Sequence, residues 1–305
     1  MAKMFTYATR ALAVALCLVA PRAGVAVSAQ QQQQPRQGQG APQKKKKLPP
    51  GAKGFAQFAD RDASDKLITA GATRGECVTY EQLIECAMGQ AGLTPPNFKE
   101  AIAFYNQASV VKPDMFRPHY NLGQIYESQG KYREAAAAYK RAVTLKIDEG
   151  MGESPINVMS AYFNLANVHA MLNEHAQSVV ALREVIRRLS EPYHTPHYNL
   201  GLSLAALGKH QEAVASFAEA IKIKPDYWEA HYNMGVAYGK LENYPRAVEA
   251  FRKTLEIKPD DAQAHYNLGL AYYFVDDAAS LAAQVRALQK SRPELARELA
   301  RLSGK

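Results

Sequence analysis

Eight histidines are the residues of this chain with the clearest capacity for metal or acid–base chemistry, and half of them recur in one pentapeptide. HYNLG occupies residues 119–123, 197–201 and 265–269, and HYNMG occupies residues 231–235. If each copy belongs to its own helix pair, its histidine lies roughly 10 Å from the next one. Metal ligands must converge on one ion. The spacing therefore predicts that His119, His197, His231 and His265 pack rather than bind metal.

Other signs of catalysis are weak. His194 and His197 in HTPH have an interval that two metal ligands could use, but we find no motif that completes a site. The sequence contains no glycine-rich phosphate loop, paired-carboxylate motif or nucleophile elbow. The repeats and a polar N-terminal segment leave no room for a separate catalytic domain. We therefore predict a non-enzymatic protein without catalytic residues, metal or cofactor.

The asparagine of the pentapeptide recurs at a nearly constant interval, which identifies the elements that carry it. Asn199, Asn233 and Asn267 are 34 residues apart. Asn164 lies 35 residues before Asn199, and Asn121 lies 43 residues before Asn164. The additional residues fall in the polar stretch IDEGMGESPIN. We predict an inserted loop there, because added loop length costs little free energy.

Small, aromatic and proline residues also recur at fixed distances from each pentapeptide glycine. Gly123 is followed by Tyr126, Ala135, Tyr139 and Ala142; Gly201 by Leu204, Ala213, Phe217, Ala220 and Pro225; and Gly235 by Tyr238, Ala247, Phe251, Thr254 and Pro259. This pattern resembles the tetratricopeptide repeat. The resemblance implies an all-α fold, a right-handed superhelical solenoid of antiparallel helix pairs. It implies about five to six repeats, with residues 116–293 as the main array and a closing helix over residues 294–305.

Two repeats depart from the pattern. The repeat around Asn164 has Ala166, His169, Ser178 and Leu182 at the expected glycine, aromatic, alanine and aromatic positions. The last repeat has Leu281 at a small position, where we expect a local shift of register.

Residues 59–115 are predicted to contain a leading helix and a degenerate first repeat. Thr79 is a suitable cap for the first helix of that repeat, and Pro113 follows the second. Cys77 and Cys86 favour a disulfide if the protein is exported. A helix that starts at Thr79 would instead keep the two α-carbons beyond bridging distance unless the segment bends. The sequence leaves a disulfide and two buried thiols as equal alternatives.

Positive charge is concentrated at the N-terminus. Residues 1–60 contain nine Lys or Arg and one acid, whereas residues 61–305 contain 28 of each sign. Residues 1–29 have the basic, apolar and small-residue order of a signal peptide, with cleavage expected after Ala29; a retained membrane anchor is the alternative. Residues 30–58 are rich in Gln, Pro and Lys and are predicted to form a disordered tether. We expect an exported protein, periplasmic or extracellular.

The resemblance further implies a binding surface. In this family the first helices of the repeats line a concave groove that holds a peptide. The matching residues are Tyr120, Asn121, Asn164, Tyr198, Asn199, Tyr232, Asn233, Tyr266 and Asn267, with Phe163 at the corresponding aromatic position. A row of amides could bind a peptide main chain, or the same amides could bond to neighbouring helices. The sequence leaves both roles open.

Residues that flank the asparagines predict the character of this groove. They are Arg117, Gln124, Leu202, Val236 and Leu270. Most are not basic, so we expect no clamp for a terminal carboxylate. Together with Tyr273 and Phe274, they predict a groove that is apolar toward its C-terminal half.

Our main hypothesis is a scaffold or adaptor of the cell envelope that binds a peptide or partner protein in this groove. The alternative is a spacer protein that Lys44–Lys47 tethers to a polyanion or to the envelope surface. The neutral balance of residues 61–305 gives no reason to expect nucleic acid. Membrane contact is expected only through an uncleaved signal or the basic tether. The sequence does not identify the partner or the oligomeric state.

Overall fold

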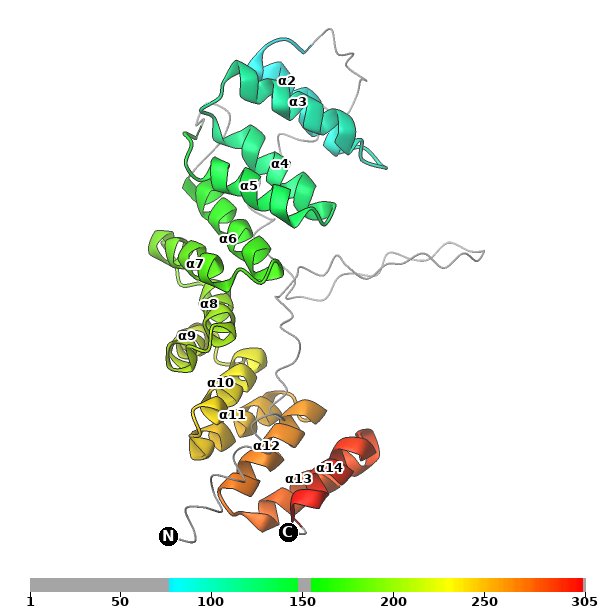
Figure 1. Cartoon of the computed structure of the whole chain (residues 1–305), viewed down its shortest axis with the longest axis vertical. Helices are drawn as coiled ribbons and strands as arrows, with labels where there is room; N and C mark the ends of the chain where they lie inside the picture. Colours follow the sequence, from blue (N-terminus) through cyan, green and yellow to red (C-terminus); the bar gives the residue numbers. More distant parts are fainter. Residues whose placement is uncertain (1–76, 148–154, 304–305) are drawn as a thin grey trace, which may run out of the picture. The chain divides into compact units, whose positions relative to one another are not determined.

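The computed structural model describes residues 77–147 and 155–303, which form thirteen α-helices and no strand (Figure 1). The predicted signal peptide, the tether, the leading helix before Cys77 and most of the inserted loop lie outside the described residues. The part of the chain that is described confirms the predicted all-α class of packed helix pairs.

Five packed helix pairs account for ten of the thirteen helices of the described chain. The pairs are α2 (Tyr80–Ala91) with α3 (Phe98–Val111), α4 (Phe116–Ser128) with α5 (Tyr132–Ala142), α8 (His194–Ala206) with α9 (His210–Ile223), α10 (Trp228–Lys240) with α11 (Tyr244–Ile257), and α12 (Ala262–Phe274) with α13 (Ala278–Ser291). Helix α6 (Pro155–Met171) packs on α5, and helix α7 (His175–Arg188) packs on α8. The last helix is α14 (Pro293–Ser303).

The helices belong to two compact units. The N-terminal unit contains α2 to α6 and ends at Asn173; the C-terminal unit begins at Glu174 and contains α7 to α14. Within each unit, every second helix also packs on the first helix of the next pair, as α5 does on α6 and α9 on α10. A repeat array is stabilised by such contacts between neighbours, because one helix pair alone cannot bury its apolar face.

The two helices of a pair approach most closely where a glycine faces an aromatic ring. A Cβ atom added to Gly123 would lie 2.5 Å from the Tyr139 ring, and one added to Gly201 would lie 2.5 Å from the Phe217 ring. Gly235 has the same relation to Phe251, at 2.8 Å. The glycine therefore recurs because a larger residue would displace a fully buried ring.

The turns that follow α4, α6, α8, α10 and α12 each use one left-handed residue at a constant place, seven residues after the position of this glycine. Glycine occupies that place at Gly130 and Gly208, where φ is 71° and 75°. Asn173, Glu242 and Asp276 adopt the same conformation, with φ between 57° and 59°. The turn geometry is thus maintained even where the sequence lacks the residue that most easily adopts it.

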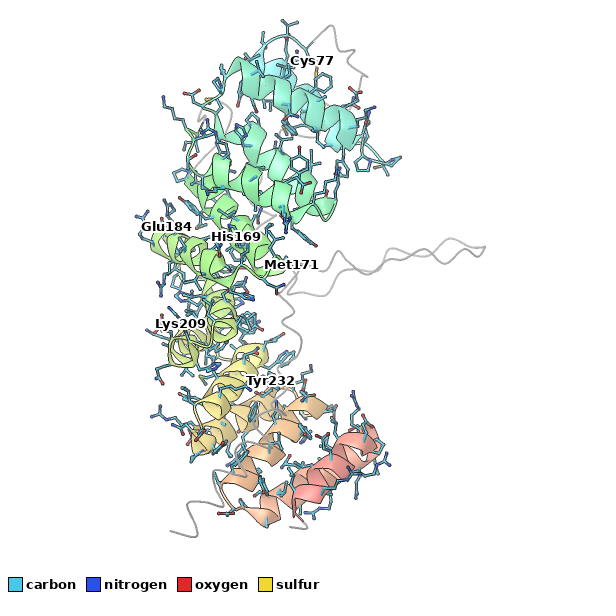
Figure 2. The ribbon with its side chains drawn as sticks, in the orientation of Figure 1. Cys77, His169, Met171, Glu184, Lys209 and Tyr232 are labelled. Carbon is cyan, nitrogen blue, oxygen red and sulfur yellow. A yellow bond between two sulfur atoms is a disulfide. The ribbon has the colours of Figure 1, made fainter. Side chains whose placement is uncertain are left out.

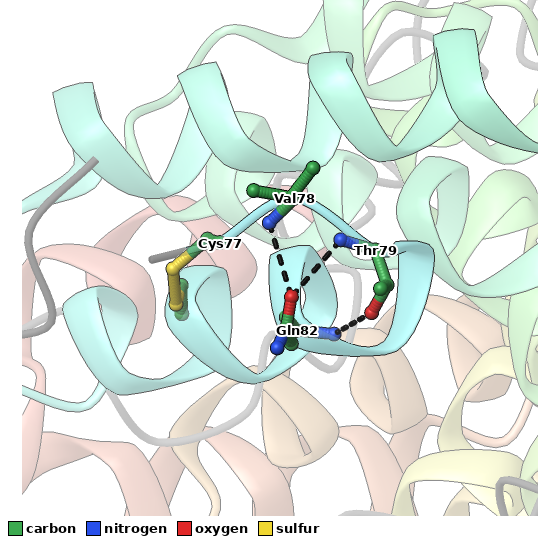
Figure 3. Close-up of a disulfide and its surroundings, with 5 residues drawn as sticks. Cys77, Val78, Thr79 and Gln82 are labelled. Carbon is green, nitrogen blue, oxygen red and sulfur yellow. Dashed lines mark hydrogen bonds between the residues drawn. A yellow bond between two sulfur atoms is a disulfide. The ribbon is translucent and has the colours of Figure 1, made fainter. Parts of the chain in front are cut away.

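A disulfide connects Cys77 to Cys86 at the start of the N-terminal unit. Cys77 precedes helix α2, so the chain bends back and brings the two α-carbons to 6.7 Å. Thr79 caps the helix as predicted, and the Gln82 side chain accepts hydrogen bonds from the backbone N–H groups of Val78 and Thr79 (Figure 3). The structure therefore selects the bridged alternative.

Helix α14 covers the C-terminal end of the array, as the sequence predicts. Its Leu299 is fully buried and packs against Gly269, at the place that an aromatic ring of the second helix occupies in earlier repeats. The Tyr266 hydroxyl donates a 2.7 Å hydrogen bond to Glu298 of the same helix. Leu281 lies in this core as well. An apolar residue at a normally small position is accommodated because α14 completes the packing.

The first helices of the pentapeptide repeats begin three residues before the histidine, for example at Phe116 and Trp228. One local prediction needs correction. Helix α6 begins at Pro155, so Pro155 to Asn157 are helical and do not belong to the loop. Proline suits the first helical position, because its missing N–H would have no partner within the helix there.

Candidate protein-binding face

Helices α4 and α6 in the N-terminal unit, and α8, α10 and α12 in the C-terminal unit, carry all nine residues predicted to line the groove. We call the surface of these helices the first-helix face of each unit. The accessible side chains on this face are the ones that could contact a partner.

The asparagines of the pentapeptide connect successive repeats. Four asparagine side chains donate to a tyrosine hydroxyl of the preceding repeat: Asn121 to Tyr105 at 2.8 Å, Asn164 to Tyr139 at 3.4 Å, Asn233 to Tyr198 at 3.1 Å and Asn267 to Tyr232 at 2.8 Å. Asn233 also donates to the backbone oxygen of Glu229, at 2.8 Å. The sequence left two roles open for these amides, binding of a peptide main chain and bonding to a neighbouring helix. The hydrogen bonds show the second role.

Burial divides the nine residues into two groups. Tyr198, Asn199, Tyr232, Tyr266 and Asn267 are buried, whereas Tyr120, Asn121, Asn164 and Asn233 are partly accessible. Tyr232, labelled on α10 in Figure 2, is 2% exposed and packs 5.7 Å from the Phe251 ring. The buried group has a clear role in packing. Contact of any of the nine with a peptide stays a prediction.

Several accessible side chains on the face of the C-terminal unit are apolar. Leu202, Ala205, Tyr273 and Phe274 are partly exposed, whereas Val236 and Leu270 pack into the core at 7% and 1% exposure. A small pocket between α10, α11 and α12 is lined by Gly239, Tyr244, Ala247, Phe251, Leu270, Ala271 and Phe274. Because Val236 and Leu270 are buried, the apolar surface predicted for the groove is limited to the partly exposed positions. These are Leu202, Ala205, Tyr273 and Phe274.

The face of the N-terminal unit contains a polar cluster that sequence reasoning missed. We call it the Glu127 cluster, and it consists of Tyr120, Glu127, Tyr139 and Asn164. The ring of Tyr139 crosses α4 at Gly123, and its hydroxyl donates a 2.7 Å hydrogen bond to Glu127 Oε2. Asn164 on α6 donates to the same hydroxyl. The Tyr120 ring lies 5.9 Å from the Tyr139 ring.

Electrostatics in the Glu127 cluster follow from its burial. Burial raises the pKa of the Glu127 carboxyl, and the hydrogen bond from Tyr139 only partly opposes this effect. Burial, assisted by the nearby Glu127 charge, raises the pKa of Tyr120 to about 12. Burial beside Glu127 also raises the pKa of Tyr139 far above its usual range. At neutral pH both tyrosines are therefore hydrogen-bond donors next to a partly desolvated carboxylate.

One cue in the sequence could have identified this cluster. The aromatic position after the pentapeptide is Tyr139 in the N-terminal unit but Phe217 and Phe251 in the C-terminal unit. A hydroxyl at a buried position needs a partner. Its acceptor, Glu127, lies twelve residues before Tyr139, where the other two repeats have Ala205 and Gly239.

Two of the pentapeptide histidines contact the turns that precede their helices. His231 Nε2 lies 3.0 Å from the Pro225 oxygen, and His265 Nε2 lies 2.8 Å from the Pro259 oxygen. Burial lowers the pKa of His119 and His197. Over residues 77–147 and 155–303, no three His, Cys, Asp or Glu side chains gather as metal ligands. None of the helices over these ranges has the length and apolarity needed to cross a membrane.

Fold and repeat geometry define the class: an all-α protein of repeated helix pairs. A family model described as TPR repeat matches residues 97–130 and 201–242, and one described as tetratricopeptide repeat matches residues 116–147 and 228–261. The chain therefore contains tetratricopeptide repeats in both units, as the sequence pattern predicts.

Solved structures support the same fold. The crystal structure of YrrB, titled a TPR protein with an unusual peptide-binding site, covers 65% of this chain and 97% of its own, with a TM-score of 0.54 and 19% sequence identity. The crystal structure of MamA protein covers 59% of this chain and 92% of its own, with a TM-score of 0.50 and 20% identity. At such identities the similarity establishes the fold alone.

Curated relatives match only part of the chain. Protein O-mannosyl-transferase TMTC2 of Homo sapiens is 32% identical over 108 residues, which are 35% of this chain and 12% of that protein. Protein O-mannosyl-transferase TMTC3 of Mus musculus is 24% identical over 149 residues, which are 46% of this chain and 16% of that protein. The chain thus covers less than a fifth of the length of either relative.

Proposed function

We propose that this chain is a non-enzymatic scaffold that binds a segment of another polypeptide on the first-helix face. The observation that carries the proposal is the placement of accessible side chains on that face. Asn121, Gln124 and Glu127 offer hydrogen-bonding groups in the N-terminal unit, whereas Leu202 and Tyr273 offer apolar surface in the C-terminal unit. A polypeptide segment presents both kinds of group, since its main chain is polar and many of its side chains are apolar.

The similarity to YrrB supports this proposal as a fold-level analogy, because that structure is described as having a peptide-binding site. The burial of Tyr232 and Asn267 changes which residues are offered for contact. They stabilise the face, and their neighbours on the same helices make the contacts.

We also propose that the protein acts in an oxidising compartment after export. The Cys77–Cys86 bridge supports this proposal, since disulfides persist mainly in secreted and envelope proteins. Cell fractionation combined with N-terminal sequencing of the mature chain tests it. We expect an N-terminus after Ala29 and no free thiol at Cys77 or Cys86. A cytosolic chain with two reactive thiols would contradict the proposal.

A comparative capture experiment tests partner binding. The full chain, Leu202→Glu and Val180→Glu are immobilised and exposed to envelope extract of the source organism. Leu202 is partly exposed on the first helix α8, whereas Val180 is 65% exposed on the second helix α7 of the same unit. We expect polypeptides retained by the wild type to be lost with Leu202→Glu and kept with Val180→Glu.

The outcome also separates the face from the basic tether. If a chain lacking residues 30–58 retains the same polypeptides at raised salt, the face binds them. Equal capture by Leu202→Glu and wild type, with loss of capture on deletion of residues 30–58, would contradict the proposal. It would instead support the tether that contains Lys44–Lys47. Circular dichroism of each variant confirms that its helices are intact.

A further inference from the structure

Glu127 differs from the paired acids of the described chain. Those acids form ion pairs on the surface, such as Glu81 with Lys112 at 2.8 Å and Glu212 with Arg183 at 3.0 Å. Glu127 is partly buried, and its hydrogen-bond partner is the neutral Tyr139 hydroxyl. Over residues 77–147 and 155–303, no Lys or Arg forms an ion pair with it. A partly desolvated carboxylate of this kind is costly unless a positive charge is brought to it.

The position of Glu127 within α4 increases this cost. It lies in the last turn of the helix, where the helix dipole places partial negative charge. The last turn of α4 contains no basic residue, whereas the next helix, α5, has Lys140 and Arg141 in its last turn. Helix dipole and carboxylate therefore both favour a cation at the same place.

Packing does not require this arrangement. Phe217 and Phe251 fill the space over Gly201 and Gly235 without a hydroxyl, as Tyr139 fills the space over Gly123. The acid and the hydroxyl occur together in the repeat of α4 and α5 and are both missing from the repeats of α8 with α9 and of α10 with α11. The Tyr105 hydroxyl of α3 accepts from Asn121 as the Tyr139 hydroxyl accepts from Asn164, so the bond to the next repeat needs the hydroxyl but not the acid. Glu127 therefore adds a carboxylate that this contact does not require, which indicates a separate role.

We propose that the Glu127 cluster binds the lysine or arginine side chain of a polypeptide that lies on the first-helix face of the N-terminal unit. The inference rests on the proposed function and specifies the chemistry of the partner. Tyr139 holds the carboxylate in place, and Asn164 holds the Tyr139 hydroxyl. The Tyr120 ring, seven residues before Glu127 on α4, packs on the Phe116 and Tyr139 rings and forms an aromatic wall of the cluster.

Capped octapeptide mixtures provide the test, because both termini are blocked and only side chains differ. One position is fixed as lysine, as norleucine of the same length without charge, as arginine, or as neutral citrulline. The labelled full-length protein is titrated against each immobilised mixture at pH 7. We expect at least tenfold tighter retention on lysine than on norleucine and on arginine than on citrulline, since a partly buried charge-assisted contact strengthens binding by about that factor or more.

Two substitutions isolate the carboxylate. Glu127→Gln keeps the size of the side chain and an acceptor for Tyr139, and we expect it to reduce the preference to less than about twofold. Glu134→Gln, at an exposed acid on the second helix α5 of the same unit, should keep the full preference. Circular dichroism verifies both folds. As an independent readout, lowering the pH to 4 should remove the preference of the wild type, because protonation neutralises Glu127.

Each remaining outcome has a distinct meaning. If the wild type binds all mixtures without favouring lysine or arginine, or if Glu127→Gln keeps the preference, the cation site is wrong and polypeptide binding on the face stands. If the wild type retains no mixture, then polypeptide binding is contradicted and the cation site is overturned with it.

Discussion

In the N-terminal unit the ring over the crossing glycine is Tyr139, whereas in the C-terminal unit it is Phe217 or Phe251. The three rings occupy equivalent space, since a Cβ atom added to Gly123, Gly201 or Gly235 would lie 2.5 to 2.8 Å from the ring that faces it. The polar partners differ. Tyr139 accepts from Asn164 in the N-terminal unit, whereas in the C-terminal unit Asn233 and Asn267 donate to Tyr198 and Tyr232 of the first helices.

This difference separates packing from recognition. Both units satisfy the pentapeptide asparagines with a tyrosine hydroxyl, but only the arrangement around Tyr139 also holds a carboxylate at the accessible face. The phenylalanine repeats have Ala205 and Gly239 at the position of Glu127 and are apolar there. The same helix pair can thus present either a charged or an apolar surface through two substitutions.

Truncation of the crossing ring should give the largest effect and tests whether the two units share one packing scheme. We expect Tyr139→Ala and Phe217→Ala each to lower the free energy of unfolding of their own unit by about 3–5 kcal/mol, because each removes a fully buried ring. Hydrogen exchange of peptides from each unit, measured across denaturant concentrations, reports the two stabilities separately. A loss below about 1 kcal/mol in either unit would contradict a shared scheme.

Removal of the disulfide should come next and should affect one unit only. We expect the Cys77→Ser, Cys86→Ser double variant to lower the stability of the N-terminal unit by about 2–3 kcal/mol, because the bridge closes a loop with a sequence separation of 9. The same hydrogen-exchange measurement should find the C-terminal unit unchanged. Equal losses in both units would show that they unfold together rather than separately.

The helix pairs and their order could be predicted from the sequence, because the packing positions recur every 34 residues and each has one steric role. Gly201 must be small since Phe217 crosses it, and Pro225 follows a helix end. The bridge could not be predicted, because it depends on the bend of the chain before α2, and spacing alone does not specify that bend.

The candidate site was harder to predict than the fold. The 34-residue spacing indicates which residues lie on the first helices of the repeats. It does not indicate which of these residues the next repeat buries. Tyr232 and Asn267 are buried because the following helix packs over them, while Glu127 stays accessible at the end of α4. Its significance depends on a hydrogen bond to the next helix, which is a tertiary contact.

Exchange of the tyrosine and phenylalanine positions should have an intermediate effect. Tyr139→Phe leaves Glu127 without its donor, and we expect a loss of about 1–2 kcal/mol in the N-terminal unit. Phe217→Tyr buries a hydroxyl beside Ala205 without a carboxylate, and we expect a loss of about 1–3 kcal/mol in the C-terminal unit.

The double variant Phe217→Tyr, Ala205→Glu should regain part of that loss if the pair acts as a unit, and chemical denaturation of the two variants measures the difference. A further loss in the double variant would contradict the transferability of the pair. Asn121→Ala provides a reference for the loss of one hydrogen bond between repeats, because it removes the bond to Tyr105 and leaves Glu127 in place.

The smallest expected effect is a difference in pH dependence between the units. Burial lowers the pKa of His194, His197 and His210 in the C-terminal unit below the ordinary value of 6.5. The unfolded chain then binds more protons at mildly acidic pH, so stability is present above pH 6.5 and is lost as pH falls through the folded values. We expect acidification from pH 7.5 to 5.5 to increase hydrogen exchange of the C-terminal unit.

In the N-terminal unit His119 has the same sign as these histidines, whereas Glu127 has the opposite sign. Its pKa is raised by burial above the ordinary 4.5, so the folded state holds its proton more tightly than the unfolded state. The stability it contributes is present at low pH and is lost as pH rises through the folded value. Glu127→Gln should therefore stabilise the N-terminal unit relative to wild type more at pH 7.5 than at pH 4. If a lysine-containing peptide is bound, the advantage of the variant at pH 7.5 should disappear, because the bound cation then compensates the carboxylate of the wild type.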